Sequence, residues 1–185
     1  MTIQARPYAD LDAMAVFRQL DPMDQVEAEL ARGAPVTALS LFADWRAMEP
    51  HRPLSFVALT SPARGAHPFA VFGLINTGQA GIAAAALLAR NHVKFRRPIA
   101  ELAAAIRRDL PAYARDAGIH RIEARSWFDH PTASALLSAL GFDHECDMPG
   151  FGRTGTVVFR QFAWVARPSD AAVPACVPTP NEGTS

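Results

Sequence analysis

The sequence predicts an α/β domain in which a mixed, mostly antiparallel central sheet carries helices on both faces. Three observations lead to this fold class. Apolar residues at helical spacing fill most of the first 48 residues, three strand-like runs joined by short turns follow, and strands then alternate with helices up to about residue 165. Short turns give antiparallel neighbours, whereas a strand–helix–strand crossover gives a parallel pair, so the sheet must be mixed.

Three helices are expected before the first strand. The first covers Asp10–Leu20, and its first residue can cap it. Asp21 and Pro22 end it and begin a second helix, because proline is favoured at the first helical position. Gly33 ends this second helix, since glycine readily takes the left-handed conformation that follows a last turn. The third helix is expected within Val36–Met48.

Three strands are expected next, at Leu54–Thr60, Phe69–Asn76 and Ile82–Ala89. The third run is ambiguous, because its sequence IAAAALLA contains good helix formers. A hairpin turn at residues 76–78 favours a strand. Further on, the pattern predicts a helix at Pro98–Ala117, a strand at Ile119–Trp127 and a helix at His130–Leu140, which Asp129 opens and Gly141 closes. The last strand is expected at Val157–Val165, with a further strand before it near residues 143–148.

The composition suits one domain, assigned to residues 1–166, followed by a tail. Half of the 185 residues are hydrophobic, enough for a sizeable core. Residues 167–185 are rich in Pro, Ala, Ser and Thr and are predicted to be disordered. The balance of 18 basic and 18 acidic side chains argues against a nucleic-acid partner.

The sequence has two cysteines, Cys146 and Cys176. The second lies in the Pro-rich tail and neither has metal-ligand spacing around it, so neither a disulfide nor a metal site is expected. The first ten residues have no apolar core of a signal peptide, and the longest apolar run is too short for a bilayer. The sequence thus predicts a cytoplasmic protein with no membrane partner.

Two segments resemble the GNAT superfamily of N-acetyltransferases. One is the helical stretch ending in Leu140-Gly141-Phe142, and the other is Arg-Ile-Glu-Ala-Arg at residues 121–125. With the order of elements, the resemblance covers residues 3 to 165. The chain also looks like a divergent branch found among phage and prophage proteins, through Leu20-Asp21-Pro22-Met23-Asp24 followed by Glu27, and through Ala70–Gly73.

The resemblance implies acetyl-CoA as co-substrate, bound in a V-shaped opening between two central strands, and an amine as acceptor. The strand before the long helix would contact the pantetheine arm, at Leu88 and Arg90. The N-terminus of the long helix would hold the diphosphate, because free amides and the helix dipole attract anions.

The matching diphosphate segment lacks the glycines usual in the family. Its candidate residues are Lys94, Arg96, Arg97, Pro98 and Ile99. Cβ atoms would crowd a phosphate close to the backbone, but the basic side chains can bind it instead. The other interpretation is a solvated basic loop.

The catalytic groups are also altered. Leu137 stands where the family often has a tyrosine acid, and a leucine cannot donate a proton. His130 stands where an asparagine is usual. It could bond to pantetheine, act as a base, or only cap its helix. Glu123 is the candidate general base, with His120 and His92 as alternatives.

Some assignments stay open. Glu123 could instead only pair with the arginines on either side of it. Met148–Gly152 could form a mobile flap over the acceptor or belong to an edge strand. The functional alternatives are an N-acetyltransferase and a non-catalytic binding or structural protein, such as a component of a phage or phage-derived particle. A homodimer is compatible with the aromatic final strand.

Overall fold

The computed structural model describes residues 3–61, 63 and 65–167. Its elements follow the chain in this order: β1 (Ile3–Pro7), α1 (Asp10–Phe17), α2 (Pro22–Arg32), α3 (Ala38–Ala47), a 3₁₀ turn (Glu49–His51), β2 (Leu54–Thr60), β3 (Pro68–Asn76), β4 (Ile82–Ala89), α4 (His92–Asp116), β5 (Arg121–Trp127), α5 (Ala133–Leu140), β6 (Asp143–Phe151) and β7 (Val157–Val165). The predicted tail, apart from Arg167, lies outside the described residues.

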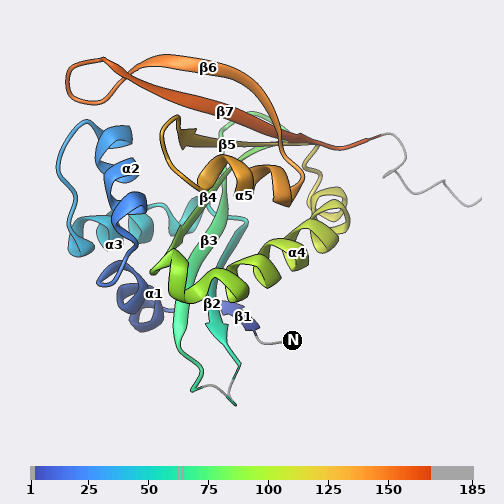
Figure 1. The fold of residues 1–185 in the computed structure, drawn as a ribbon. Helices are drawn as coiled ribbons and strands as arrows, with labels where there is room; N and C mark the ends of the chain where they lie inside the picture. The colour runs from blue at the N-terminus through green and yellow to red at the C-terminus, as the bar shows by residue number, and fades with distance from the viewer. Residues whose placement is uncertain (1–2, 62, 64, 168–185) are drawn as a thin grey trace, which may run out of the picture.

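Seven strands form one sheet in the order β1-β2-β3-β4-β5-β7-β6. All neighbours are antiparallel except β4 and β5, which the long crossover helix α4 connects. Helices α4 and α5 cover one face, and α1 and α3 cover the other (Figure 1). The predicted fold class is therefore confirmed.

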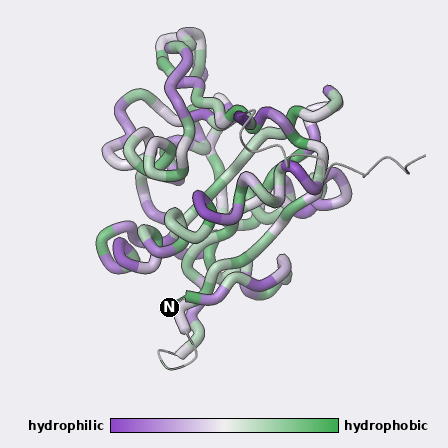
Figure 2. Tube along the Cα trace, turned by 90° about the vertical axis from the view of Figure 1, so that its right-hand side faces the viewer, coloured by the Kyte–Doolittle hydropathy of each residue, from purple (hydrophilic) through white to green (hydrophobic). Residues whose placement is uncertain are grey.

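The core has one part on each face of the sheet. Val16 and Phe17 of α1 and Trp45 of α3 pack on β2 and β3, while Leu102 and Leu110 of α4 pack on the opposite face. Figure 2 shows hydrophobic residues along the central strands and hydrophilic ones toward the outer loops. No helix in the described ranges is both long and apolar enough to cross a membrane.

Local signals account for several element ends. Asp21 caps α2 by accepting a hydrogen bond from the backbone N–H of Met23, with Pro22 as the first helical residue. Gly33 and Gly141 end α2 and α5 in the left-handed conformation, with φ of 71° and 93°. These features agree with the sequence.

Several predicted element bounds and caps were wrong, and strand β1 was not predicted. Ala9, and not Asp10, occupies the N-cap of α1. Helix α5 begins at Ala133, three residues later than predicted, and Asp129 does not cap it. Helix α4 begins at His92, six residues before the predicted start at Pro98.

The segment predicted as a mobile flap is the end of β6. Phe151 packs on Phe159 with ring centroids 4.6 Å apart, and the backbone N–H of Gly152 donates to the carbonyl of Leu30 in α2 at 3.1 Å. These contacts fix the segment to β7 and α2, which supports the alternative interpretation as an edge strand.

Candidate functional site

Strands β4 and β5 pair over only three residue pairs before they separate. The last pair joins Ala84 to Glu123, although β4 continues to Ala89 and β5 to Trp127. Beyond this fork, no strand among the described residues pairs with the side of β4 that faces β5. The structure thus contains the V-shaped opening that the resemblance implied.

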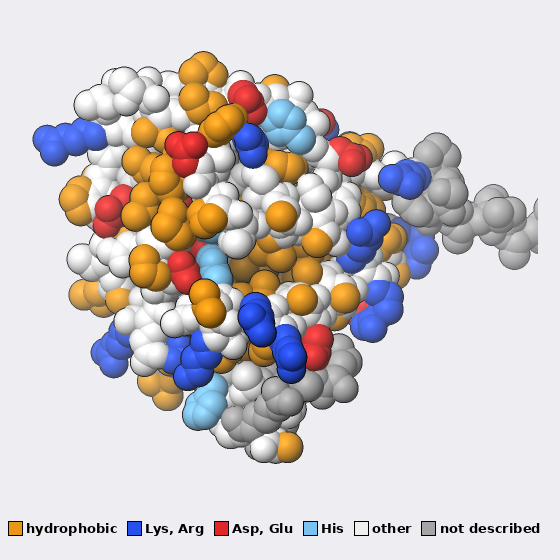
Figure 3. Space-filling view, viewed as in Figure 1, with side chains coloured by type: hydrophobic (Ala, Val, Ile, Leu, Met, Phe, Trp, Pro, Cys, Tyr) orange, Lys and Arg blue, Asp and Glu red, His pale blue; other side chains and the backbone are white. Residues whose placement is uncertain are grey.

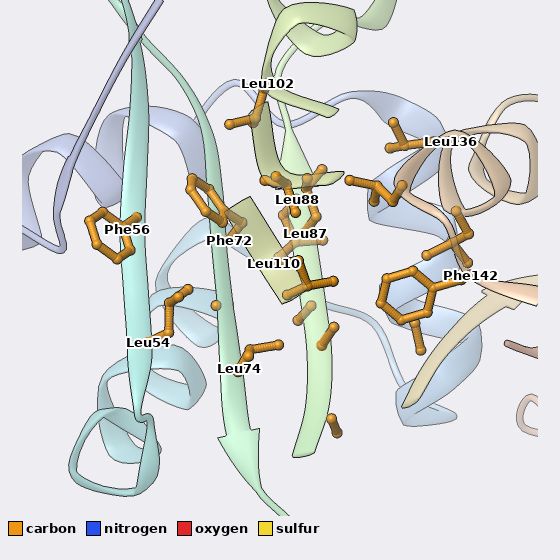
Figure 4. A pocket seen from close by; sticks show the side chains of 18 of the residues that line it. Leu54, Phe56, Phe72, Leu74, Leu87, Leu88, Leu102, Leu110, Leu136 and Phe142 are labelled. Carbon is orange, nitrogen blue, oxygen red and sulfur yellow. The ribbon is translucent and has the colours of Figure 1, made fainter. Parts of the chain in front are cut away.

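A cavity of about 640 Å³ lies beside the fork, between the sheet, α4 and α5. Figure 3 shows it as a hollow floored by hydrophobic side chains, between the positions of α4 and α5. Figure 4 shows large apolar side chains directed into it from the strands and both helices, among them Phe56, Phe72, Leu87, Leu102 and Leu136. A concave, mostly apolar pocket of this size is typical of a small-molecule site.

Helix α2 supplies an unusual carboxyl group to this cavity. Glu27 lines it, and its buried Oε2 has no hydrogen-bond partner within the part of the chain that the structure describes. Burial raises the pKa of Glu27 to about 7, although His130 and a hydrogen bond from the backbone of Trp127 act in the opposite direction. Buried polar atoms normally have a partner, so an unpaired carboxyl oxygen with a raised pKa beside a cavity marks Glu27 as a candidate functional residue.

Asp24, one turn earlier on α2, links three other elements. Its Oδ1 lies 3.0 Å from Nε2 of His92 and 3.2 Å from Nε2 of His130, while its Oδ2 accepts from the backbone N–H of Ala89 at 2.7 Å. Burial acts to raise the pKa of Asp24, but the hydrogen bonds to both histidines outweigh it and lower the pKa. Burial likewise acts to lower the pKa of His92, and Asp24 more than compensates, so that pKa is raised. Asp24 and His92 therefore form an ion pair.

The protonation of His130 follows from its contacts. Its Nδ1 accepts backbone hydrogen bonds from Thr132 at 3.3 Å and Ala133 at 3.0 Å, so the ring proton lies on Nε2 and is donated to Asp24. Three ligand atoms of Asp24, His92 and His130 lie within 4.8 Å of one another, which is metal-like spacing. A metal on Nε2 of His130 would have to displace the proton that the neutral ring carries there. A histidine that binds a metal normally donates a hydrogen bond from its other nitrogen, but Nδ1 of His130 accepts hydrogen bonds. The cluster therefore fits a hydrogen-bonded network and not a metal site.

Side chains of this protein occupy the N-terminal amides of α4. The N–H of His92 donates to Asp21 at 2.8 Å, and the N–H of Lys94 donates to Asn91 at 2.8 Å. Pro98 and Ile99 lie inside the helix, so the prediction that they open it was wrong. The helix start therefore offers few free amides for an anion.

The remaining cofactor candidates differ in their surroundings. Leu88 lines the cavity. Arg90 donates to the carbonyl of Pro68 at 2.6 Å and also bonds to the side chain of Gln19. Three basic residues in the first two turns of α4 are exposed: Lys94, Arg96 and Arg97. Figure 3 shows cationic side chains over α4 beside the hollow.

The two predicted catalytic residues, Glu123 and His130, lie in different surroundings. Glu123 lines the cavity at the fork and pairs with Arg121 at 2.8 Å, so the expected ion pair is present and a role as general base stays a prediction. His130 is buried and caps α5 while it holds Asp24. Leu137 faces the cavity without a proton donor, and the hydroxyl of Tyr113 donates to the carbonyl of Pro53 at 3.0 Å.

Sequence reasoning did not assign a chemical role to Glu27 or Asp24. A signal was present, because carboxylates three residues apart share one face of a helix. Only the packing of that face against the ends of β4 and β5 distinguishes them from ordinary surface acids.

The sequence matches no family model and no curated protein. Solved structures are similar. A GNAT-family acetyltransferase from Bacillus anthracis aligns with a TM-score of 0.66 at 11% identity, over 89% of this chain and 95% of that one. A GNAT-superfamily phosphinothricin acetyltransferase from Sinorhizobium meliloti, in complex with acetyl-CoA, gives 0.62 at 14%, over 90% and 89%. The ribosomal-protein-S5-alanine acetyltransferase from Vibrio fischeri gives 0.61 at 13%, over 89% and 93%. With its forked β4–β5 pair, this chain therefore has the fold of the GNAT acetyltransferases.

Proposed function

We propose that the protein is an acyl-CoA-dependent N-acyltransferase acting on an amine, with acetyl transfer as its simplest reaction. One observation carries this proposal: the β4–β5 fork connects an apolar cavity with the buried carboxyl group of Glu27. The similarity to a phosphinothricin acetyltransferase solved with acetyl-CoA supports the choice of co-substrate.

Glu27 is the proposed general base. An amine acceptor arrives as an ammonium ion and must lose a proton before its nitrogen can attack the thioester carbonyl. A carboxyl group with a pKa of about 7 is half ionised at neutral pH and can accept that proton. The new C–N bond forms as the C–S bond breaks, the nitrogen releases its second proton to water, and the leaving CoA thiolate takes up a proton from water.

The other groups of the site bind and orient. The unpaired edge of β4 beyond Ala84, at Leu88, is suited to the amide groups of pantetheine. Because Asp21 and Asn91 occupy the amides of α4, the diphosphate depends on side chains, with Arg96 and Arg97 as the main candidates.

The two predicted catalytic residues take distinct parts in this proposal. Glu123, at the fork, attracts the cationic acceptor and is a second acceptor for its proton. His130 is a positioning residue in this proposal, since it hydrogen-bonds to Asp24 and is not among the residues that line the cavity. Two neighbouring charges also act on the pKa of Glu27: that of Asp24 acts to raise it and that of His92 acts to lower it.

The second candidate function is a non-catalytic binding or structural protein with this fold, for example in a phage-derived particle. The observation in its favour is the occupied N-terminus of α4, which leaves few amides for a diphosphate. Such a protein would have no affinity for CoA.

Thermal unfolding with and without acetyl-CoA separates the two. Acetyl-CoA at one hundred times its Kd adds about 2.7 kcal/mol to the free energy of unfolding. For a domain of this size, that raises Tm by roughly 5–11 °C. No change in Tm at millimolar acetyl-CoA would exclude the enzyme and leave the non-catalytic alternative.

A further inference from the structure

We propose that the acyl donor carries a hydrocarbon chain of medium length, which lies in the part of the cavity beneath α4. This inference rests on the proposed function, because it assigns the chain to a CoA thioester at the fork. It goes beyond acetyl transfer by naming the class of acyl group that the site accepts.

Small side chains create the space. Four consecutive alanines, Ala83 to Ala86, occupy β4, and the last three of them line the cavity together with Ala105 of α4. Larger residues of α4, such as Leu102 and Leu110, pack into the core and also line the cavity. The short side chains among them fill little of the space between helix and sheet.

Large apolar side chains around this space remain only half buried. Phe56, Phe72, Leu87, Ile106 and Leu136 all line the cavity and are all partly exposed, although they lie between helix and sheet. Water against such a surface is unfavourable, and covering it stabilises a complex in proportion to the apolar area removed from water. The lining therefore favours a hydrocarbon occupant.

Charges are confined to the edges of the cavity. Among the described lining residues, the charged ones are Glu27, Glu123 and Arg125 near the fork and Asp109 on the exposed side of α4. The interior between them offers no charged partner for a polar substituent, and burying an unpaired polar group is costly. A polar acyl group, such as a succinyl group, would lack a partner there.

The extent of the cavity sets the chain length. Its lining residues run from β4 and β5 across β3 and β2 to Ala5 of β1. Three strand spacings from β4 to β1 give a span of about 14 Å. An extended chain advances roughly 1.2 Å per bond, so about ten to twelve carbons fill it.

Calorimetric titration of the full chain with CoA, acetyl-CoA, hexanoyl-CoA and decanoyl-CoA tests the inference. Each fully covered methylene raises affinity about fourfold. Partial covering still gives at least ~10-fold tighter binding of decanoyl-CoA than of acetyl-CoA. Equal affinities for acetyl-CoA and decanoyl-CoA would overturn the inference and leave the proposed function in place, whereas no binding of any CoA compound would overturn both.

Two alanines on α4 provide a matched pair of variants. Ala105→Leu fills the cavity, whereas Ala104→Leu adds the same side chain at an exposed position outside the lining. Ala105→Leu should lower the ratio of decanoyl-CoA to acetyl-CoA affinity about tenfold or more, and Ala104→Leu should not change it. An unchanged ratio in folded Ala105→Leu, or binding of free decanoate without binding of decanoyl-CoA, would overturn the assignment. The chain-length series on the unmodified protein decides the question if Ala105→Leu does not fold.

Discussion

Replacing Glu27 by glutamine should stabilise the protein at alkaline pH while it removes activity. The glutamate has a pKa of about 7 in the folded protein, against an ordinary value of 4.5, because burial disfavours its charged form. Folding therefore strengthens proton binding at this site. The contribution of the protonated Glu27 to the free energy of unfolding is present at low pH and is lost as the pH rises from 4.5 through 7. A glutamine never ionises and avoids this loss.

The magnitude follows from the two pKa values. They differ by about 2.5, and each pKa unit corresponds to 1.36 kcal/mol, so the full effect is about 3 kcal/mol. At pH 8 almost all of it is expressed, and at pH 4 almost none. In a domain of this size, about 3 kcal/mol changes Tm by roughly 6–12 °C. Any pH-independent effect of the new amide group cancels when the two pH values are compared.

The assay is urea unfolding at pH 4, 6 and 8 for the unmodified protein, Glu27→Gln and Glu29→Gln. The control residue lies on the same helix, where its Oε1 accepts weak hydrogen bonds that a glutamine can keep. Relative to the unmodified protein, Glu27→Gln should gain about 3 kcal/mol between pH 4 and pH 8, and Glu29→Gln should gain little. Activity should fall by about 10²-fold or more in Glu27→Gln alone. An equal stability difference at pH 4 and pH 8 would refute the reasoning.

Three further predictions test other parts of the structure. Arg97→Glu should weaken CoA binding about tenfold, and less at 1 M salt, while Arg115→Glu near the far end of the same helix should have little effect in the same titration; equal losses would mean that the diphosphate lies elsewhere. Asp24→Asn should remove the partner that raises the pKa of His92, so an NMR titration should find that pKa lowered, and urea unfolding should record a loss of about 3 kcal/mol; an unchanged pKa would contradict the ion pair. Gly73→Ala should cost about 1–3 kcal/mol, because a Cβ there would lie 2.6 Å from a backbone carbonyl oxygen of β2, and unaltered unfolding would contradict that contact.

Local chemistry allowed much of the fold to be predicted. The Asp21-Pro22 start of α2, the glycines that end α2 and α5, and strands β2, β4 and β7 agree with their sequence patterns. Each depends on residues within a few positions of one another. The fold class followed from the order of these elements together with the resemblance.

The site needed the tertiary structure. The start of α4 is set by Asn91, with φ of 25°, and by Asp21, which lies 71 residues before His92 in the chain and accepts its N–H. Strand β1 is a short, largely exposed edge, so its own sequence has little apolar alternation. The sequence determined which residues carry charge and where local elements begin and end. Only the packing of α2 against the diverging ends of β4 and β5 decided that Glu27 is desolvated and Asp24 is paired, because desolvation and pairing depend on atoms that are distant in the chain.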